Sequence, residues 1–378
     1  MAHMDTVLND AVKTGAVPFV VGMVGNAGGV TYSGAAGHAA EGLAAGEDTV
    51  FRVFSMTKAV GSVAAMILID QGKLSMDTPV ADVLPAWNEL KVLDRMHGDT
   101  PQMRAPTVQA TARHLATHTS GLEYEFWNAQ VPEFMEKTGH PTILSGLKTS
   151  LAYPLTNDPG TRWGYGPSID WLGQMVEAID GRRIDAFCKE EIFDPLGMTN
   201  TAFEPDGLES RLADVVIRGE DGAFGPMEIA PPPQPEVYGM GHALYSTAPD
   251  YMKFLRMILN KGTLDGQQVL SSSAADSMQA DQMRGLSFEK MTSVSPLTAD
   301  VELEGDPSHS FIAVVHREDV PGKRSAGTQS WAGVLNTHYW LDPKKDVAAV
   351  IMTQSLPFVE PQFMAVYDAY ERAVYAHA

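Results

Sequence analysis

The stretch Val53-Phe54-Ser55-Met56-Thr57-Lys58 lies at the junction of two kinds of predicted structure. Before it, residues 49–54 are rich in β-branched and aromatic side chains, which is typical of a strand. After it, residues 59–70 are rich in Ala, Val, Met, Ile and Leu, which indicates a buried helix. The pattern places a serine on the first turn of that helix, with a lysine three residues later on the same face. A hydroxyl beside an amine supplies a nucleophile and a base.

Ser-x-x-Lys also occurs at Ser145/Lys148 and at Ser287/Lys290. The first of these pairs lies in a polar stretch, and no apolar helix follows the second. Only Ser55 has a predicted strand before it and a predicted buried helix after it. The alternative interpretation of Ser55 is an N-cap serine on a core helix, followed by a solvated lysine.

The length and the net charge of the chain limit the number of domains and the kinds of binding partner that we expect. The chain has 378 residues, of which 44% are hydrophobic and 20% charged, and this is enough for two domains or for one domain with a large insertion. Its formal net charge of −20 argues against nucleic acids and anionic membrane surfaces as partners. We therefore expect a small molecule as its partner, and the sequence leaves the oligomeric state open.

Several features that the sequence lacks indicate the cellular compartment of the protein. Cys188 is the only cysteine, so no intrachain disulfide can form, and its helical spacing with Ile184 and Phe187 indicates a buried residue. The sequence starts without a basic and apolar signal region, and it contains no run of 18 apolar residues. These features favour a cytoplasmic protein, with a previously removed signal as the alternative.

Predicted strands occur near both ends of the chain, and helices dominate the middle. Strands are expected at residues 19–25, 29–34, 311–316, 336–341 and 347–353, and helices at 5–12, 169–179, 183–193, 248–261 and 364–376. Residues 88–107 form a long polar connection without clear periodicity. The simplest architecture is an α+β fold, in which residues 1–76 and 205–378 form a domain with an antiparallel sheet flanked by helices. Residues 77–204 then form a mostly helical second domain, and Ser55 falls at the seam, where pockets are common.

Further motifs follow Ser55-Met56-Thr57-Lys58 in a fixed order. They are Leu115-Ala116-Thr117-His118-Thr119-Ser120-Gly121-Leu122, Asp158-Pro159-Gly160-Thr161-Arg162-Trp163-Gly164-Tyr165, Phe193-Asp194-Pro195-Leu196-Gly197-Met198 and Trp331-Ala332-Gly333. Together these motifs resemble the class C β-lactamase and penicillin-binding-protein superfamily, and in particular its family VIII carboxylesterase branch. The resemblance extends over nearly the whole chain and implies a β-lactamase-like fold.

The resemblance also implies a role for each matching residue. Ser55 corresponds to the nucleophile, and Lys58 to the group that takes its proton. Partial burial near a helix N-terminus disfavours the ammonium form of this lysine, which suits a base. Tyr165 corresponds to the family tyrosine between the serine and the leaving group. The oxyanion hole is expected to consist of the backbone N–H groups of Ser55 and Val334.

Two departures from the β-lactamase pattern concern the substrate. Pro167 stands where the family has an asparagine, which removes an amide that holds the lysine. Trp331-Ala332-Gly333 replaces the family's Lys-Thr-Gly, which deletes a cation that binds carboxylates and provides an apolar wall instead. We therefore expect Pro167, Trp331 and Gly333 to shape the substrate site, with His242 lining it. We expect His118 to have a structural rather than a catalytic role, and we expect His338 to line the pocket.

These observations predict a serine carboxylesterase that hydrolyses short-chain acyl esters through an acyl-enzyme, with weak β-lactamase side activity. An amidase, a D-amino-acid peptidase or a β-lactamase of the same fold is the alternative, and a non-catalytic binding homologue is a more distant one. Lys58 is the favoured base, with Tyr165 as a proton relay. No cofactor and no metal are expected, since paired cysteines and His-Glu-x-x-His are absent from the sequence.

Overall fold

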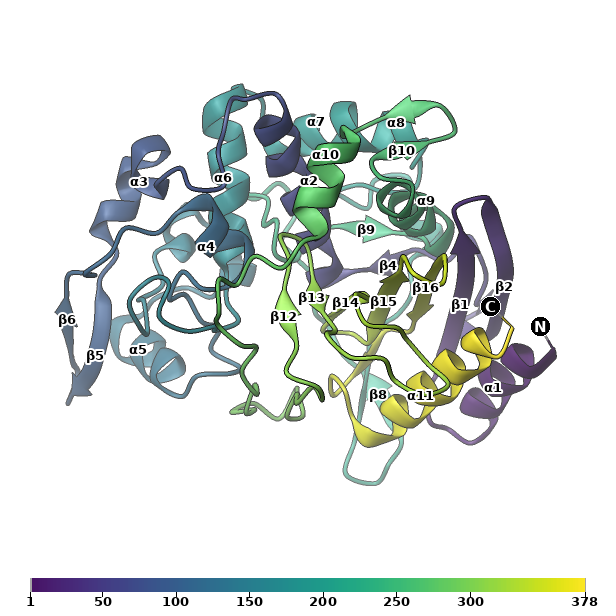
Figure 1. Ribbon diagram of the computed structural model, residues 1–378. Coiled ribbons are helices and arrows are strands. Elements are labelled where there is room, and N and C mark those ends of the chain that lie inside the picture. The colour runs from purple at the N-terminus through teal and green to yellow at the C-terminus, as the bar shows by residue number, and fades with distance from the viewer. Residues whose placement is uncertain (1, 378) are drawn as a thin grey trace.

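The computed structural model describes residues 2–377, and its largest element is an eight-stranded antiparallel sheet (Figure 1). The strand order is β12-β13-β14-β15-β16-β1-β2-β3, so the first and last parts of the chain share one sheet. The strands are β1 (Phe19–Asn26), β2 (Gly29–Ala40), β3 (Leu43–Ala44), β12 (Ser308–His309), β13 (Val314–Val315), β14 (Gln329–Gly333), β15 (Thr337–Asp342) and β16 (Val347–Met352). The predicted α+β class, with an antiparallel sheet flanked by helices, is confirmed.

The sheet is covered by helices on both faces because its central strands are apolar on both sides. In β1, Val20 and Val24 pack with helices α1 (Ala2–Lys13) and α11 (Pro361–Tyr375), which lie side by side in Figure 1. The alternate side chains Phe19, Val21 and Met23 belong to the main core, together with α2 (Thr57–Asp70) and α9 (Ala248–Leu259). This two-residue alternation is the ordinary consequence of a pleated strand.

Helices and loops dominate the part of the chain between the two groups of sheet strands. The helices there are α3 (Val80–Val83), α4 (Ala112–Ala116), α5 (Gln130–Thr138), α6 (Ser168–Asp180), α7 (Ile184–Cys188), α8 (Asp194–Leu196) and, nearer the C-terminal strands, α10 (Ser272–Gln279). Short helical turns are η1 (Phe54–Met56), η2 (Pro85–Glu89), η3 (Ile143–Ser145), η4 (Lys148–Leu151), η5 (Lys189–Phe193) and η6 (Glu209–Arg211). Helix α6 packs against α2, which connects this region to the main core. The division into domains at residues 77 and 204 stays a prediction.

Short strand pairs complete the molecule. They are β4 (Phe51–Arg52) with β9 (Tyr245–Ser246), β5 (Val92–His97) with β6 (Thr100–Arg104), β10 (Thr263–Leu264) with β11 (Gln267–Gln268), and the set β17 (Ser355–Leu356), β7 (Val216–Arg218) and β8 (Phe224–Pro226). Most of the long polar connection over residues 88–107 forms the β5–β6 hairpin at the left of Figure 1. Within residues 2–377, no helix is both long and apolar enough to cross a bilayer.

Candidate active site

The turn that carries Ser55 is shorter and tighter than the sequence predicts. The expected strand over residues 49–54 is reduced to β4, because Phe54 already begins the helical turn η1. Phe54 has φ +41°, a left-handed conformation that is costly for a bulky residue and is often found at functional sites. Its ring is held in a small apolar cluster with Leu335 and Leu356. The packed ring fixes the sharp turn and directs Ser55 into a cavity.

Lys58 lies one turn further along, on the first turn of α2, and its amine contacts the serine. Its Nζ is 3.1 Å from Ser55 Oγ, 3.1 Å from the Tyr124 hydroxyl and 2.8 Å from the Gly241 carbonyl oxygen. The side chain is buried, with 3% exposure. The amine is therefore held by uncharged oxygens from two distant segments of the chain.

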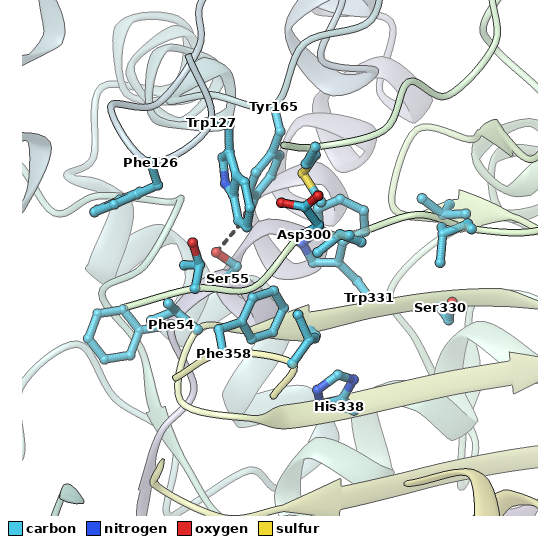
Figure 2. Close-up of a pocket in the computed structure, with 18 of the residues that line it drawn as sticks. Phe54, Ser55, Phe126, Trp127, Tyr165, Asp300, Ser330, Trp331, His338 and Phe358 are labelled. Atoms are coloured by element: carbon cyan, nitrogen blue, oxygen red, sulfur yellow. Dashed lines mark hydrogen bonds between the residues drawn. The ribbon is translucent and has the colours of Figure 1, made fainter. Parts of the chain in front are cut away.

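Tyr165 also contacts the serine, and the Lys58 amine lies 4.9 Å from the centroid of its ring. Its hydroxyl donates to Ser55 Oγ at 2.7 Å, the hydrogen bond drawn as a dashed line in Figure 2. The Tyr165 carbonyl accepts from the Tyr124 N–H at 3.0 Å, which joins the two tyrosine-bearing loops. The structure thus brings Ser55, Lys58 and Tyr165 together, although 110 residues separate the first from the last.

The end of strand β14 forms a wall beside the serine. Trp331, Ala332 and Val334 line the same cavity as Ser55. A Cβ atom on Gly333 would clash with the Val53 carbonyl oxygen and the Thr337 hydroxyl. Only glycine therefore permits this strand end to pack so closely against the turn that precedes the nucleophile.

His118 is enclosed by the aromatic side chains of this wall. Its ring stacks on Trp331, with 6.1 Å between centroids, and meets Tyr165 edge to face at 4.9 Å. Burial lowers the pKa of His118 well below its usual value, with a smaller contribution from the positive charge of Lys58. A neutral imidazole in this position supports the two aromatic rings by packing.

The remaining predicted residues occupy different places. His242 lines the cavity, and its Nδ1 lies 3.6 Å from Asp170 Oδ1. His338 also lines the cavity and packs against Phe363. Pro167 is buried as the N-cap residue of α6, and it is not part of the cavity wall. The proline thus acts on the site through the start of α6 rather than by touching a ligand there.

The cavity above Ser55 has a volume of about 790 Å³, which is within the usual range for ligand pockets. Near the serine its wall is mainly aromatic and aliphatic, with Phe54, Phe126, Trp127, Trp331, Val334 and Phe358 (Figure 2).

The cavity lining also includes the cations Lys323, Arg324 and Arg372, and each is ion-paired with Asp368 or Glu371. The acids Asp300, Glu302 and Glu304 line it as well, and Asp300 lies near Trp331 in Figure 2. The aromatic side chains beside Ser55 still give that part of the wall a mainly apolar surface.

Sequence reasoning missed two polar residues of the site. Tyr124 contacts Lys58, and burial raises its pKa well above the usual value, so that the phenol stays protonated. Asp170 accepts a hydrogen bond from the Gly241 N–H at 3.2 Å, and burial raises its pKa to about 6. Tyr124 closely follows the Thr-His-Thr-Ser-Gly motif, and Asp170 lies five residues after Tyr165. This closeness to two of the motifs is the sequence signal that could have identified both residues.

Metal binding was examined over residues 2–377. No group of three or more His, Cys, Asp or Glu side chains is placed there to hold a metal ion. The buried thiol of Cys188 lies in the helical region, where burial raises its pKa above the usual range.

Comparison with known proteins agrees with this geometry. The model of the beta-lactamase family matches residues 4–372. Lovastatin esterase from Penicillium rubens is 29% identical over 386 residues, covering 96% of this chain and 95% of that protein. Monacolin J acid methylbutanoyltransferase from Aspergillus terreus is 28% identical over 351 residues, covering 87% of this chain and 82% of that protein.

A mutant of simvastatin synthase from Aspergillus terreus superposes with a TM-score of 0.86 at 26% identity, over 99% of this chain and 94% of that one. The family and the fold that the motifs predict are therefore confirmed, and the named relatives are an esterase and acyl-transfer enzymes. The chain belongs to the beta-lactamase family, as a serine hydrolase or acyl-transfer enzyme with a beta-lactamase-like fold.

Proposed function

We propose that this protein is a serine carboxylesterase of the family VIII type, with Ser55 as nucleophile, Lys58 as base and Tyr165 as proton relay. The observation that carries the proposal is the position of Ser55 Oγ, 3.1 Å from the Lys58 amine and 2.7 Å from the Tyr165 hydroxyl at the wall of a cavity. Both distances are within the hydrogen-bonding reach that proton transfer requires.

The contacts of Lys58 favour its action as the base. A neutral amine has two N–H donors and one lone pair. The Gly241 carbonyl and the Tyr124 hydroxyl can accept both N–H groups, which directs the lone pair toward the Ser55 hydroxyl. The serine proton then passes to Lys58 as Oγ attacks the ester carbonyl carbon.

The next steps follow from the other groups around Ser55. The backbone N–H groups of Ser55 and Val334 would stabilise the oxyanion, and such a donor typically contributes about 3 kcal/mol to the barrier. Tyr165 would give its proton to the leaving alkoxide and take up the proton that Lys58 received from Ser55, which leaves an acyl-enzyme on Ser55 and a neutral lysine. A water molecule then gives a proton to Lys58 as its oxygen attacks the acyl carbon, and Lys58 returns that proton to Ser55 Oγ as the acid leaves.

The cavity supports an ester of a short acyl group with a large apolar alcohol. A volume of about 790 Å³ with an aromatic wall accommodates more than a small ester, and Trp331 presents an apolar surface beside the nucleophile. One relative is named for its action on lovastatin and another for transfer of a methylbutanoyl group to monacolin J acid. A matched ester substrate should therefore be cleaved faster than its amide.

Acyl transfer is the second candidate function, and the apolar wall around Ser55 favours it. A bulky alcohol bound against this wall would exclude water, and the alcohol, instead of water, could then accept the acyl group from Ser55. Relatives with this activity in their names cover more than four fifths of this chain. Addition of such an alcohol during ester turnover should then yield a new ester, which chromatography would detect.

The central test is Ser55→Ala, assayed with p-nitrophenyl acetate and butyrate. Turnover should fall by at least about 10³-fold, since removal of a serine nucleophile is among the most costly changes in such enzymes. Ser287→Ala is the matched control, because Ser287 is an exposed serine of another Ser-x-x-Lys stretch and should leave turnover unchanged. Undiminished turnover in Ser55→Ala would remove this residue from the mechanism.

A paired comparison separates the esterase from its nearest rivals. The ester and the amide of the same short acid should be compared by kcat/KM, together with a penicillin. The proposal expects the ester to be the best of the three substrates. Faster cleavage of the amide or of the β-lactam would assign the site to an amidase or a β-lactamase instead.

A further inference from the structure

A buried carboxylate lies behind Lys58, on the far side of the residue Gly241. Asp170 is on the first turn of α6, and its side chain has no exposure to solvent. Its Oδ1 accepts a hydrogen bond from the Gly241 N–H at 3.2 Å, and its Oδ2 has no hydrogen-bond partner among the described residues. Burying a carboxylate with so few hydrogen-bond partners lowers the stability of the folded protein. A functional role is therefore the expected reason for its presence.

Gly241 connects this carboxylate to Lys58. Its N–H donates to Asp170, and its carbonyl oxygen accepts from Lys58 Nζ at 2.8 Å. Glycines permit this close approach. A Cβ atom on Gly241 would lie 2.5 Å from Asp170 Oδ2, and one on Gly239 would lie 2.7 Å from Asp170 Oδ1. The glycine-rich turn 239–242 therefore places Gly241 between an acid and an amine, with its N–H bound to Asp170 and its carbonyl oxygen bound to Lys58.

The other groups around Asp170 carry no negative charge at neutral pH. Burial lowers the pKa of His242 to about 3, so this imidazole is neutral, and burial raises the pKa of the Tyr124 phenol. On the side of Lys58, the neighbours are Ser55, Tyr165 and the neutral His118.

Asp170 does not line the cavity itself, whereas other carboxylates do, namely Glu125, Asp300, Glu302, Glu304 and Asp368. Glu125 accepts from the hydroxyl groups of Thr142 and Tyr153. Asp300 and Glu302 pair with Lys290, and Asp368 pairs with Lys323 and Arg372. Asp170 is therefore the carboxylate that the glycine turn joins to the lysine.

We infer that Asp170 is a positioning residue for Lys58, holding the Gly241 carbonyl on the amine and stabilising the ammonium that forms when Ser55 attacks. This inference rests on the proposed role of Lys58 as base. The serine proton moves from Oγ to Nζ, the new bond forms between Oγ and the electrophile, and Asp170 forms and breaks no bond. A fixed carboxylate stabilises the charge that develops at the amine without reorganisation of solvent.

The test uses a reaction that requires only the nucleophile and its base. A p-nitrophenyl alkylphosphonate forms a bond between phosphorus and Ser55 Oγ and releases p-nitrophenolate, which is followed by absorbance. The rate of this reaction is measured against pH in the wild-type protein and in Asp170→Asn. Asparagine keeps an oxygen acceptor for the Gly241 N–H and removes the charge.

The negative charge of Asp170 favours positive charge at the base, and Asp170→Asn removes it. The acid limb of the profile should therefore move down by about one pH unit, as expected when a nearby opposite charge is removed. The plateau rate should fall by up to about tenfold, because the developing ammonium has lost its charge partner. A lower rate with an unmoved acid limb would assign Asp170 a purely structural role and overturn the inference.

Asp250→Asn is the matched control. Asp250 is also buried, at 1% exposure, but it lies on α9, where it pairs with Lys253 and accepts from the Asn200 N–H at 2.6 Å. Its substitution should leave the acid limb in place. Absence of any phosphonate on Ser55 in the wild-type protein would reject the proposed function itself, which keeps the two failures distinct.

A second measurement does not require Asp170→Asn to fold. The Asp170 carboxyl can be titrated by carbon-13 NMR in the wild-type protein and in Lys58→Met, which keeps the length of the side chain and removes its charge. The positive charge of Lys58 favours the ionised carboxylate, so the pKa of Asp170 should rise by about one unit in Lys58→Met. An unchanged pKa would show that the two groups do not interact and would overturn the inference.

Discussion

The hydroxyl of Tyr124 lies 3.1 Å from Nζ of Lys58 and is one of the uncharged oxygens that hold this amine. In Tyr124→Phe the neutral lysine would lose one acceptor, and its lone pair would no longer be directed at Ser55. We expect kcat for p-nitrophenyl butyrate to fall about tenfold, a loss of about 1.4 kcal/mol in transition-state stabilisation, with KM little changed.

Tyr238→Phe is the control for this substitution. Tyr238 is a buried tyrosine whose hydroxyl donates to Glu204 at 2.6 Å, and it does not line the cavity. Its loss should affect stability and leave kcat unchanged. Equal effects of Tyr124→Phe and Tyr238→Phe on kcat would contradict the role given to Tyr124.

The local pattern around Ser55 was sufficient to predict that the Ser55 hydroxyl and the Lys58 amine lie close together. Ser55 and Lys58 lie three residues apart on one helical turn, so their proximity follows from helical periodicity. Strand β16 was similarly readable because it is a continuous apolar run, and β15 because it is rich in aromatic residues and separated from β16 by turn residues. Tyr165 and the end of β14 were located only through the order of the family motifs, since no local rule relates residues so far apart.

What the sequence did not predict depends on contacts between distant segments. Tyr124 contacts Lys58, and Asp170 contacts Gly241, only after two loops and α6 have packed. Neither position has a local pattern that distinguishes it from an ordinary buried residue. The β5–β6 hairpin was missed because its residues are largely polar and exposed. The strand before Ser55 was predicted too long because the left-handed conformation of Phe54 is imposed by packing of its ring.

The close approach of Gly333 to Val53 gives a prediction about the wall beside Ser55. In Gly333→Ala, the new methyl group would clash with the Val53 carbonyl oxygen, a backbone atom that cannot rotate away. The end of β14 should move, and with it Val334, the second proposed oxyanion donor. We expect kcat/KM to fall about 100-fold, the scale of losing one such donor, together with a lower Tm.

Gly225→Ala is the comparison for this variant, because a Cβ atom on Gly225 would meet open space in the short strand β8. Its kcat/KM should match that of the wild-type protein. Full activity in Gly333→Ala would show that the position of this strand end is unimportant for the reaction.

Buried histidines predict that the protein is labile to acid. Burial lowers the pKa of His242, His316 and His338 to about 3 each, below the ordinary value of 6.5. The unfolded chain binds more protons than the folded protein between these values, so the free energy of unfolding should fall as pH falls below 6.5. His338→Gln should reduce this slope by up to about 1.4 kcal/mol per pH unit, as measured by urea unfolding at a series of pH values. An unchanged slope would contradict the prediction.

Asp170 should act on stability in the opposite direction. Its pKa of about 6 in the folded protein is above the ordinary 3.8, so the folded protein binds the additional proton between these values. The contribution of this group to stability is therefore greatest at low pH, and it is lost as pH rises through 6. Asp170→Asn removes this titration.

The free energy of unfolding of Asp170→Asn, relative to that of the wild-type protein, should therefore be higher at pH 8 than at pH 5. The expected difference is about 1.4 kcal/mol, which corresponds to the titration of one proton over about one pH unit. Urea unfolding of both proteins at the two pH values measures this difference. An equal effect at both pH values would mean that the carboxylate does not titrate there. If Asp170→Asn is more stable than the wild-type protein at pH 8 but reacts more slowly with the phosphonate, the Asp170 carboxylate lowers stability and raises the reaction rate. That result would explain why an ionised carboxylate with few hydrogen-bond partners is present beside Gly241. Stability is then lowered locally to support the ammonium of Lys58, as is common where function requires buried charge.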